Sequence, residues 1–458
     1  MKTRYTILII IVLSQLIVGC KKSDWFDVKS DINKTVPVTL EDFEYLMNDM
    51  FFMNVETPGL AEVGSDGHFI PENRWNSSAI NDVERNAYTW SLNFSNLKVK
   101  DWNASYKRIF QCNLVLDGLK RFSANTDQVR YNSIKGNALF HRAKNYYDLA
   151  QIYAQPFQAS SANSDIGIPL KDGIDVTEPA QQASVKLTYE QIIADLNSAT
   201  NLLPSLPKLK TEGSKAAAFA LLARIYLAMG DHATAGLYAN SSLNLYNRLI
   251  DFNAVDINVT SMGRFNLETI FYAQRTAVYR STWLPGIALV DPEFYALYDN
   301  NDLRKTRFFT VNSIDVTFKG NYTLYGEGFD GLAVDEQYLI RAECFARAGN
   351  TTAAMKDLND LLKTRWSNAV NYPVRTATDA EDALRQILLE RRKELLFRNL
   401  RWTDLRRLNL DPRFKVTLTR TIGGKTYTLE PGSYKYTLPI PTDVLQLAPQ
   451  MKQTPGWE

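Results

Sequence analysis

Residues 214–246 hold the feature that most constrains how this chain folds, a pair of apolar helical patterns joined by a short polar turn. On each side of the turn, apolar residues recur at steps of three and four, which places them along one face of a helix. Many of these residues are alanines, which let a neighbouring helix approach closely. The spacing Ala-x-x-Tyr-x-x-x-Gly-Asp-x-x-x-Ala, from Ala223 to Ala235, is typical of a tetratricopeptide-like unit of two antiparallel helices.

The same spacing occurs again further along the chain. Five positions match at one constant offset: Ala223 with Ala342, Tyr226 with Phe345, Gly230 with Gly349, Asp231 with Asn350, and Ala235 with Ala354. Such units cannot bury their apolar faces alone and must stack on one another. The sequence therefore predicts a mainly α fold of stacked tetratricopeptide-like helix pairs, whose units are separated by long insertions.

The longest insertion covers about residues 250–331, where the helical period disappears. Short β-like runs alternate there with glycine and proline, and aromatic residues are frequent. These are Tyr272, Tyr279, Trp283, Phe294, Tyr295, Tyr298 and Tyr325. We expect residues 39–458 to form a single domain, in which the helical scaffold carries this irregular segment.

The composition and net charge argue against two classes of binding partner, nucleic acids and anionic membrane surfaces. The 458 residues are 45% hydrophobic and 22% charged, which is ordinary for a globular protein. The formal net charge of +2 predicts binding neither to nucleic acid nor to an anionic membrane surface.

The first 20 residues predict export and lipid attachment. A basic start precedes a mostly apolar run over residues 7–18, which is too short to cross a bilayer and is typical of a signal peptide. The run ends in LIVGC, which resembles a bacterial lipobox. We therefore predict a signal peptide over residues 1–19, acylation of Cys20 (palmitate included), and a polar tether over residues 20–38. Several acyl chains would anchor the protein stably; the alternative is a buried cysteine that falls at this position by chance.

An ordered series of motifs then covers nearly the whole mature chain. They are the lipobox at Cys20, Trp102 with Tyr106 and Asn113, Arg142-Ala143, Ile168-Pro169-Leu170, Asp195-Leu196, Leu222-Ala223-Arg224, the run from Glu390 to Leu395, the run from Arg401 to Arg407, Leu438-Pro439-Ile440-Pro441, and Gln453-Thr454-Pro455-Gly456. In this order they resemble the RagB/SusD family of outer-membrane nutrient-binding lipoproteins of Bacteroidetes. The chain departs from the family in being shorter than many members, mostly in the non-helical insertion.

The resemblance implies a surface-exposed lipoprotein of the outer membrane, built from stacked tetratricopeptide-like helices. It would cap a SusC-like TonB-dependent transporter and close over a ligand caught between the two. The family's ligands are mainly glycans, and some members bind peptides.

Two loop stretches, within residues 66–93 and 279–283, combine the side chains that sugar recognition needs. Flat aromatic faces pack on the C–H surfaces of a sugar ring, and planar polar groups bind pairs of hydroxyls. Loops on a rigid scaffold are the usual place for such contacts. The resemblance favours five of their residues as ligand contacts: Asp66, Arg74, Trp90, Asn93 and Trp283. As alternatives, Trp75 or Trp90 could be a core anchor, and Asp66 could cap a turn.

The arginine-rich run from Glu390 to Arg407 suggests an anion or glycan site, but its alternating charges favour a structural role in salt bridges. Catalysis has little support, because the three histidines are scattered and no metal-ligand or nucleophile spacing occurs. We therefore predict no catalytic residue, no metal ligand and no cofactor, although a structural Ca²⁺ ion is not readable from a sequence.

The prediction is thus a glycan-binding lipoprotein, with three rival functions. The nearest is a peptide-binding member of the same family. A ligand-free tetratricopeptide-type assembly scaffold would instead pack the aromatic residues of the insertion against the helices. A hydrolase is the third, since two facing carboxylates are a property of the fold and not of the sequence.

Overall fold

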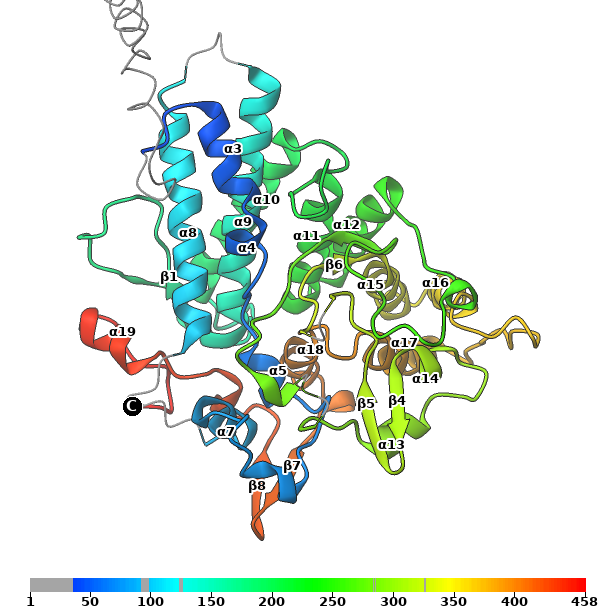
Figure 1. Ribbon diagram of the computed structural model, residues 1–458. Helices are drawn as coiled ribbons and strands as arrows, with labels where there is room; N and C mark the ends of the chain where they lie inside the picture. The colour runs from blue at the N-terminus through cyan, green and yellow to red at the C-terminus, as the bar shows by residue number, and fades with distance from the viewer. Residues whose placement is uncertain (1–35, 92–98, 123–126, 283, 285, 325–326) are drawn as a thin grey trace, which may run out of the picture.

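The computed structural model describes residues 36–91, 99–122, 127–282, 284, 286–324 and 327–458. Helices make up most of its regular structure, as predicted, and Figure 1 shows them gathered in the upper and right-hand parts of the molecule. The main helices of the scaffold are α8 (Lys100–Leu119), α9 (Gln128–Tyr153), α10 (Val185–Leu202), α11 (Lys215–Met229), α12 (His232–Leu245), α15 (Val334–Arg347), α16 (Thr351–Lys363), α17 (Ala380–Glu394) and α18 (Arg401–Leu408). Among the described residues, no helix combines the length and the apolar character needed to cross a membrane.

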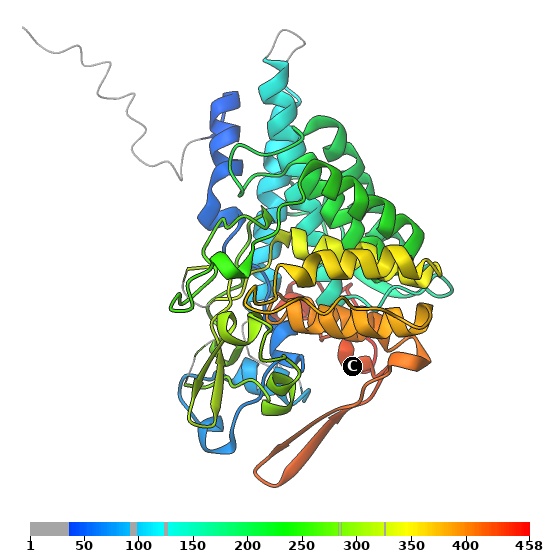
Figure 2. The ribbon, with the colours of Figure 1, turned by 90° about the vertical axis from the view of Figure 1, so that its right-hand side faces the viewer.

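The long helices pack in sequence order. Helix α8 lies on α9, α9 on α10 and α11 on α12, and α12 then packs on α15, which pairs with α16 and α17. Figure 2 shows the green, yellow and orange helices stacked one below the other. Since helices α11–α12 and α15–α16 are the two repeats found in the sequence, the prediction of stacked helix pairs is confirmed.

The two repeats turn in the same way. Gly230 and Gly349 both have φ of 79°, a left-handed conformation that glycine adopts without the steric penalty of a Cβ atom. The next residue caps the following helix in each case. The Asp231 carboxylate accepts a hydrogen bond from the Thr234 amide at 3.0 Å, and the Asn350 side chain accepts one from the Ala353 amide at 3.0 Å.

Small residues pack between the two repeats. Ala223 of α11, Ala235 and Ala239 of α12, and Ile340 and Cys344 of α15 form one buried apolar cluster. Because the α12 members of this cluster are alanines, α12 and α15 lie directly against each other even though the insertion separates them in sequence. The insertion therefore leaves the helical stack and returns to it at one place.

The strands form four small antiparallel pairs. These are β1 (Ile166–Pro169) with β2 (Gln182–Ser184), β3 (Thr269–Phe271) with β6 (Leu332–Ala333), β4 (Phe309–Asn312) with β5 (Asp315–Phe318), and β7 (Leu418–Ile422) with β8 (Lys425–Leu429). The two-glycine turn at Gly423 and Gly424, both with positive φ, joins β7 to β8 as a hairpin.

The remaining α-helices connect these parts. They are α3 (Leu40–Asn48), α4 (Met50–Met53), α5 (Leu60–Gly64), α6 (Glu72–Trp75), α7 (Asp82–Tyr88), α13 (Pro292–Ala296), α14 (Arg304–Arg307) and α19 (Thr442–Leu447).

The insertion has a core of its own, made largely of aromatic rings. Its buried members include Phe252, Tyr272, Phe294, Tyr298, Phe308, Phe309, Tyr322 and Phe329. Leu396 and Phe397, which follow α17, complete this cluster from the helical side. Of the insertion aromatics named from the sequence, Tyr272, Tyr279, Phe294 and Tyr298 are buried and Tyr295 is half-buried.

Candidate functional site

The two loop stretches singled out in the sequence lie side by side. The amide of Phe69 donates to the carbonyl of Leu289 at 2.8 Å, and the amide of Leu289 donates back at 3.0 Å. The amide of Ser281 donates to the carboxylate of Glu84 at 2.7 Å. We call the surface formed by residues 54–91, the described residues of 274–291 and the two hairpins β4–β5 and β7–β8 the loop face; it is at the bottom of Figure 1.

Glu84 joins these two stretches from the start of α7. One carboxylate oxygen accepts from the Asn81 amide at 2.9 Å, which completes a capping box with the Asn81 side chain, and the other accepts from Ser281. Glu84 is fully buried, and this burial raises the pKa of its carboxyl group. Glu84 was not among the residues predicted from the sequence, although the Asn-x-x-Glu spacing of a capping box is visible there.

Arg420 fixes the β7–β8 hairpin to the loop face. Its guanidinium lies over the ring of Tyr88, 3.6 Å from the centroid, and over the ring of Trp90 at 4.6 Å. It also donates to the backbone carbonyls of Ser65 and Tyr88. Burial lowers the pKa of this guanidinium. Arg420 has no motif around it that would have identified this contact in the sequence.

Asp66 lies between two arginines from the helical scaffold. Its carboxylate accepts from Arg401 at 2.6 and 2.9 Å and from Arg392 at 3.2 Å. Although burial opposes ionisation, these two cations hold the pKa of Asp66 well below its usual range. The carboxylate therefore joins the loop face to α17 and α18.

Arg74 and Trp75 occupy the end of α6 on the loop face. Arg74 pairs with Asp315 of β5 at 2.5 Å, while its second terminal nitrogen has no hydrogen-bond partner among the described residues. The half-buried ring of Trp75 packs on Tyr88 with 5.5 Å between centroids. Both residues are half-buried, and the unpaired nitrogen of Arg74 is itself a buried atom.

Trp90 lies in the core, in contrast to its predicted place on a ligand surface. Only 1% of the residue is exposed, and its indole nitrogen donates to the carbonyl of Gly64 at 3.0 Å. In this arrangement Trp90 offers no ring face to a ligand, so the core-anchor alternative describes it. The other two predicted contacts, Asn93 and Trp283, and the predicted lipid site, Cys20, lie outside the described residues.

The arginine-rich run is largely engaged in ion pairs. Arg391 and Arg407 both bind Asp404 at 2.8 Å, and Arg407 also binds Glu343 at 2.6 Å. Arg406 has no carboxylate partner among the described residues, but it donates to carbonyls at the end of α9, where the helix dipole is negative. These contacts agree with the structural role predicted for this run.

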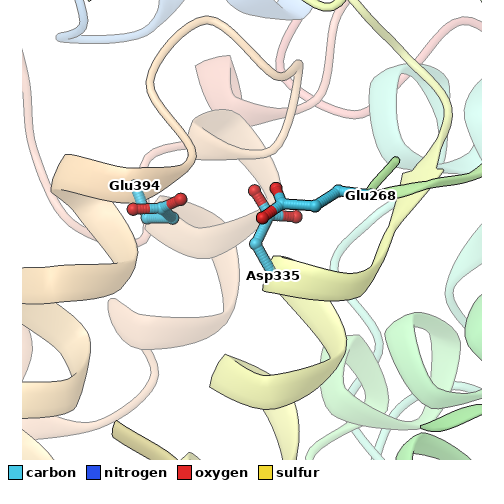
Figure 3. A group of neighbouring side chains, drawn as sticks. All are labelled: Glu268, Asp335 and Glu394. Carbon is cyan, nitrogen blue, oxygen red and sulfur yellow. The ribbon is translucent and has the colours of Figure 1, made fainter. Parts of the chain in front are cut away.

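Figure 3 shows three carboxylates, Glu268, Asp335 and Glu394, pointing toward one another from separate segments. Their oxygens lie within 4.8 Å of one another, and all three residues are buried. Oxygen ligands suit Ca²⁺. The same three carboxylates, however, accept from arginines: Arg365 lies 2.7 Å from both Glu268 and Glu394, and Arg398 lies 3.0 Å from Asp335. The donor set therefore fits a buried salt-bridge cluster better than a metal site.

The cluster extends further and joins the insertion to the helices. It contains the carboxylates of Glu268, Asp302, Asp335, Glu390 and Glu394 and the cations of Arg304, Arg365, Lys393 and Arg398. Carboxylates outnumber cations by one. Burial, together with the neighbouring Glu268, raises the pKa of Asp335 to about 7, against the opposing effect of Arg398.

Two family models match the chain. One, described as starch-binding and associating with the outer membrane, matches residues 24–227, and the model of the SusD family matches residues 335–457. The chain belongs to the SusD family. SusD-like protein P2 of Formosa agariphila is 27% identical over 355 residues, which cover 62% of this chain and 67% of that protein.

Solved structures of the SusD superfamily share the fold. One from Bacteroides vulgatus has a TM-score of 0.73 at 21% identity and covers 92% of this chain and 99% of its own. A SusD-like carbohydrate binding protein, also from Bacteroides vulgatus, has a TM-score of 0.67 at 24% identity over 90% and 97%. A laminarin binding SusD-like protein has a TM-score of 0.65 at 19% identity over 91% and 98%.

Proposed function

We propose that this SusD-family protein is a cell-surface lipoprotein that binds glycans at the loop face and delivers them to a SusC-like TonB-dependent transporter. Membership of the family is the observation that carries the proposal. Two structural neighbours described as carbohydrate binding and laminarin binding support the ligand class. Acylation of Cys20 would hold the protein at the outer membrane, where it would act as a binding protein and not as an enzyme.

The loop face is suited to capture because its segments are fixed before a ligand arrives. Glu84, Asp66 and Arg420 each bind two segments together, and every such contact is buried or partly buried. Binding to a preorganised surface avoids the entropy cost of ordering loops. Arg74 and Trp75 supply a guanidinium donor and a ring, the pair that a sugar with hydroxyls on one face and C–H groups on the other can use.

The burial of aromatic residues in the insertion favours a second candidate function. Tyr272, Tyr279, Phe294 and Tyr298 are at most 6% exposed, which is the packing expected of a ligand-free assembly scaffold. Such a protein would bind a partner through its stacked helices and would not bind glycan.

A glycan array with the soluble protein starting after Cys20 tests the proposal. We expect binding to one class of sugar, weakened about tenfold or more in Arg74→Ala and Trp283→Ala, because each loses a polar or stacking contact. Lys356→Ala, on the exposed side of α16, is the control and should bind as the wild type does. Binding to a peptide library instead would identify the peptide-binding rival. Binding to neither, with full binding to a transporter, would support the scaffold function.

A further inference from the structure

A cleft on another side of the molecule lies between three segments that are far apart in the sequence. The start of α8, a surface strap of residues 169–180 that follows β1, and the region of α19 enclose a volume of about 490 Å³. This volume is within the range of small-ligand sites, about 300–1,000 Å³. No lining residue belongs to the loop face. In Figure 1 the strap projects to the left of α8, above α19.

The strap is held firmly at its first end. The side-chain amide of Asn113 donates to the carbonyl of Lys171 at 2.7 Å, and the hydroxyl of Tyr146 donates to the same carbonyl at 2.6 Å. The hydroxyl of Tyr106 donates to the carbonyl of Pro169 at 2.9 Å. These contacts come from α8 and α9, so the wall of the cleft is fixed to the helical scaffold.

The other end of the strap is held by the C-terminal segment. The side-chain amide of Gln450 donates to the carbonyl of Ala180 at 2.6 Å, and Gln182 exchanges two hydrogen bonds with the backbone of Lys452, at 2.8 and 3.0 Å. With both ends fixed, the cleft is formed without a ligand. A preformed cleft loses little entropy when it is filled.

The chemistry of the cleft combines an aromatic and aliphatic floor with a polar rim. The half-buried ring of Tyr106 packs on Trp102 with 5.0 Å between centroids, and Met451 and Ala448 lie among the apolar lining residues. Asn103 lies three residues before Tyr106, which places its exposed amide on the same side of α8. Across the cleft, Glu178 adds a carboxylate that lies 3.4 Å from the Lys171 ammonium, and Gln450 adds an amide whose nitrogen also donates to Ala180.

This arrangement favours a ligand that has both C–H faces and paired hydroxyls. A ring stacks on C–H surfaces, and planar amides and carboxylates bind two neighbouring hydroxyls at once. A purely apolar side chain would use the floor but none of the three planar polar groups. We propose that the cleft is a second carbohydrate site, which binds a short oligosaccharide independently of the loop face. The ligand class rests on the proposed function, whereas the location of the site is inferred from the geometry of the cleft alone.

Fluorine NMR of the soluble protein labelled with 5-fluorotryptophan tests the proposal, because Trp102 lines the cleft and Trp75 lies on the loop face. Each resonance is assigned by a Trp→Phe variant. The probe is a mixture of malto-, laminari-, xylo- and manno-oligosaccharides, followed by the single sugar that causes the largest shift. We expect a saturable shift of the Trp102 resonance. In Asn103→Ala the dissociation constant reported by Trp102 should rise about tenfold, with the melting temperature unchanged. Asn73→Ala, a matched change on the loop face, should leave the Trp102 response as it is.

The possible results separate this site from the proposed function. A shift of Trp75 without one of Trp102 would overturn the second site and leave the proposed function intact. A shift of Trp102 caused by an apolar peptide but by no sugar would also overturn it, and would show that the cleft binds protein. No shift of either resonance, together with an empty glycan array, would overturn both.

Discussion

The helical repeats and the insertion have buried cores that differ in the size of their side chains. Where α11, α12 and α15 meet, the core consists of small side chains such as Ala223, Ala235 and Ala239, all with no exposed surface. The core of the insertion consists of large rings, and it borders a cluster of buried charges. The first core depends on close approach of regular backbones, and the second on specific partners from distant segments. The first should therefore fail when side chains are enlarged, and the second when a single partner is removed.

The largest effect should follow the loss of Arg365. Its guanidinium is 2.7 Å from both Glu268 and Glu394, and Arg365→Met would leave these buried carboxylates without that cation. Removing one partner of a buried ion pair costs about 3–5 kcal/mol. Urea unfolding of the soluble protein should show a loss of this size. Lys356→Ala removes the exposed pair with Asp360 and should cost at most about 1 kcal/mol; equal losses would show that the cluster adds no stability.

The second largest effect should be a change of stability with pH. The folded-state pKa of Asp335 is raised from 3.8 to about 7, so the native state binds this proton more tightly than the unfolded chain does. The resulting stability is present below pH 4 and is lost as the pH rises toward 7, at no more than about 1.4 kcal/mol per pH unit.

The comparison for this prediction is Asp335→Asn, which cannot lose the proton. Its unfolding free energy should change less than that of the wild type between pH 5 and 7. This window avoids Asp66 and Glu343, whose lowered pKa values give the opposite slope only in more acidic solution. Identical slopes for the two proteins would mean that Asp335 is ionised throughout.

Enlarging a small residue tests the helical core. Ala223→Leu adds three carbon atoms at a position with no exposed surface, and overpacking of this kind costs about 1–3 kcal/mol. Leu237→Ala on the exposed side of α12 should change the unfolding free energy by less than about 0.5 kcal/mol. Full stability of Ala223→Leu would show that the helices can move apart.

The smallest effect should be at the turn of the second repeat. Gly349→Ala introduces a Cβ atom at φ of 79°, where the backbone strain costs about 1 kcal/mol. No atom lies within 4 Å of the added Cβ, so strain alone should act. Thermal unfolding of Gly349→Ala and Gly230→Ala should show similar decreases; a decrease in only one would mean that the two turns are not equivalent.

These differences also explain what the sequence could reveal. The alanine spacing around Gly230 and Gly349 is local and periodic, so the helix pairs and their turns could be predicted. The ring of Trp90 has no such local mark: its burial depends on Gly64 and on Arg420, which is far away in the sequence. Loops carry little periodicity, so their composition did not separate exposed side chains from buried ones.

The close contact between α12 and α15 has a consequence for how proteins of this type can vary. Since the chain leaves and re-enters the stack at neighbouring helices, the intervening segment spans almost no distance, whatever its length. The entropy cost of closing a loop rises only slowly with the number of residues in it. The segment between the two repeats can thus vary in length, provided that Glu268, Asp302 and Arg304 keep their pairs with the buried charges of the helical part.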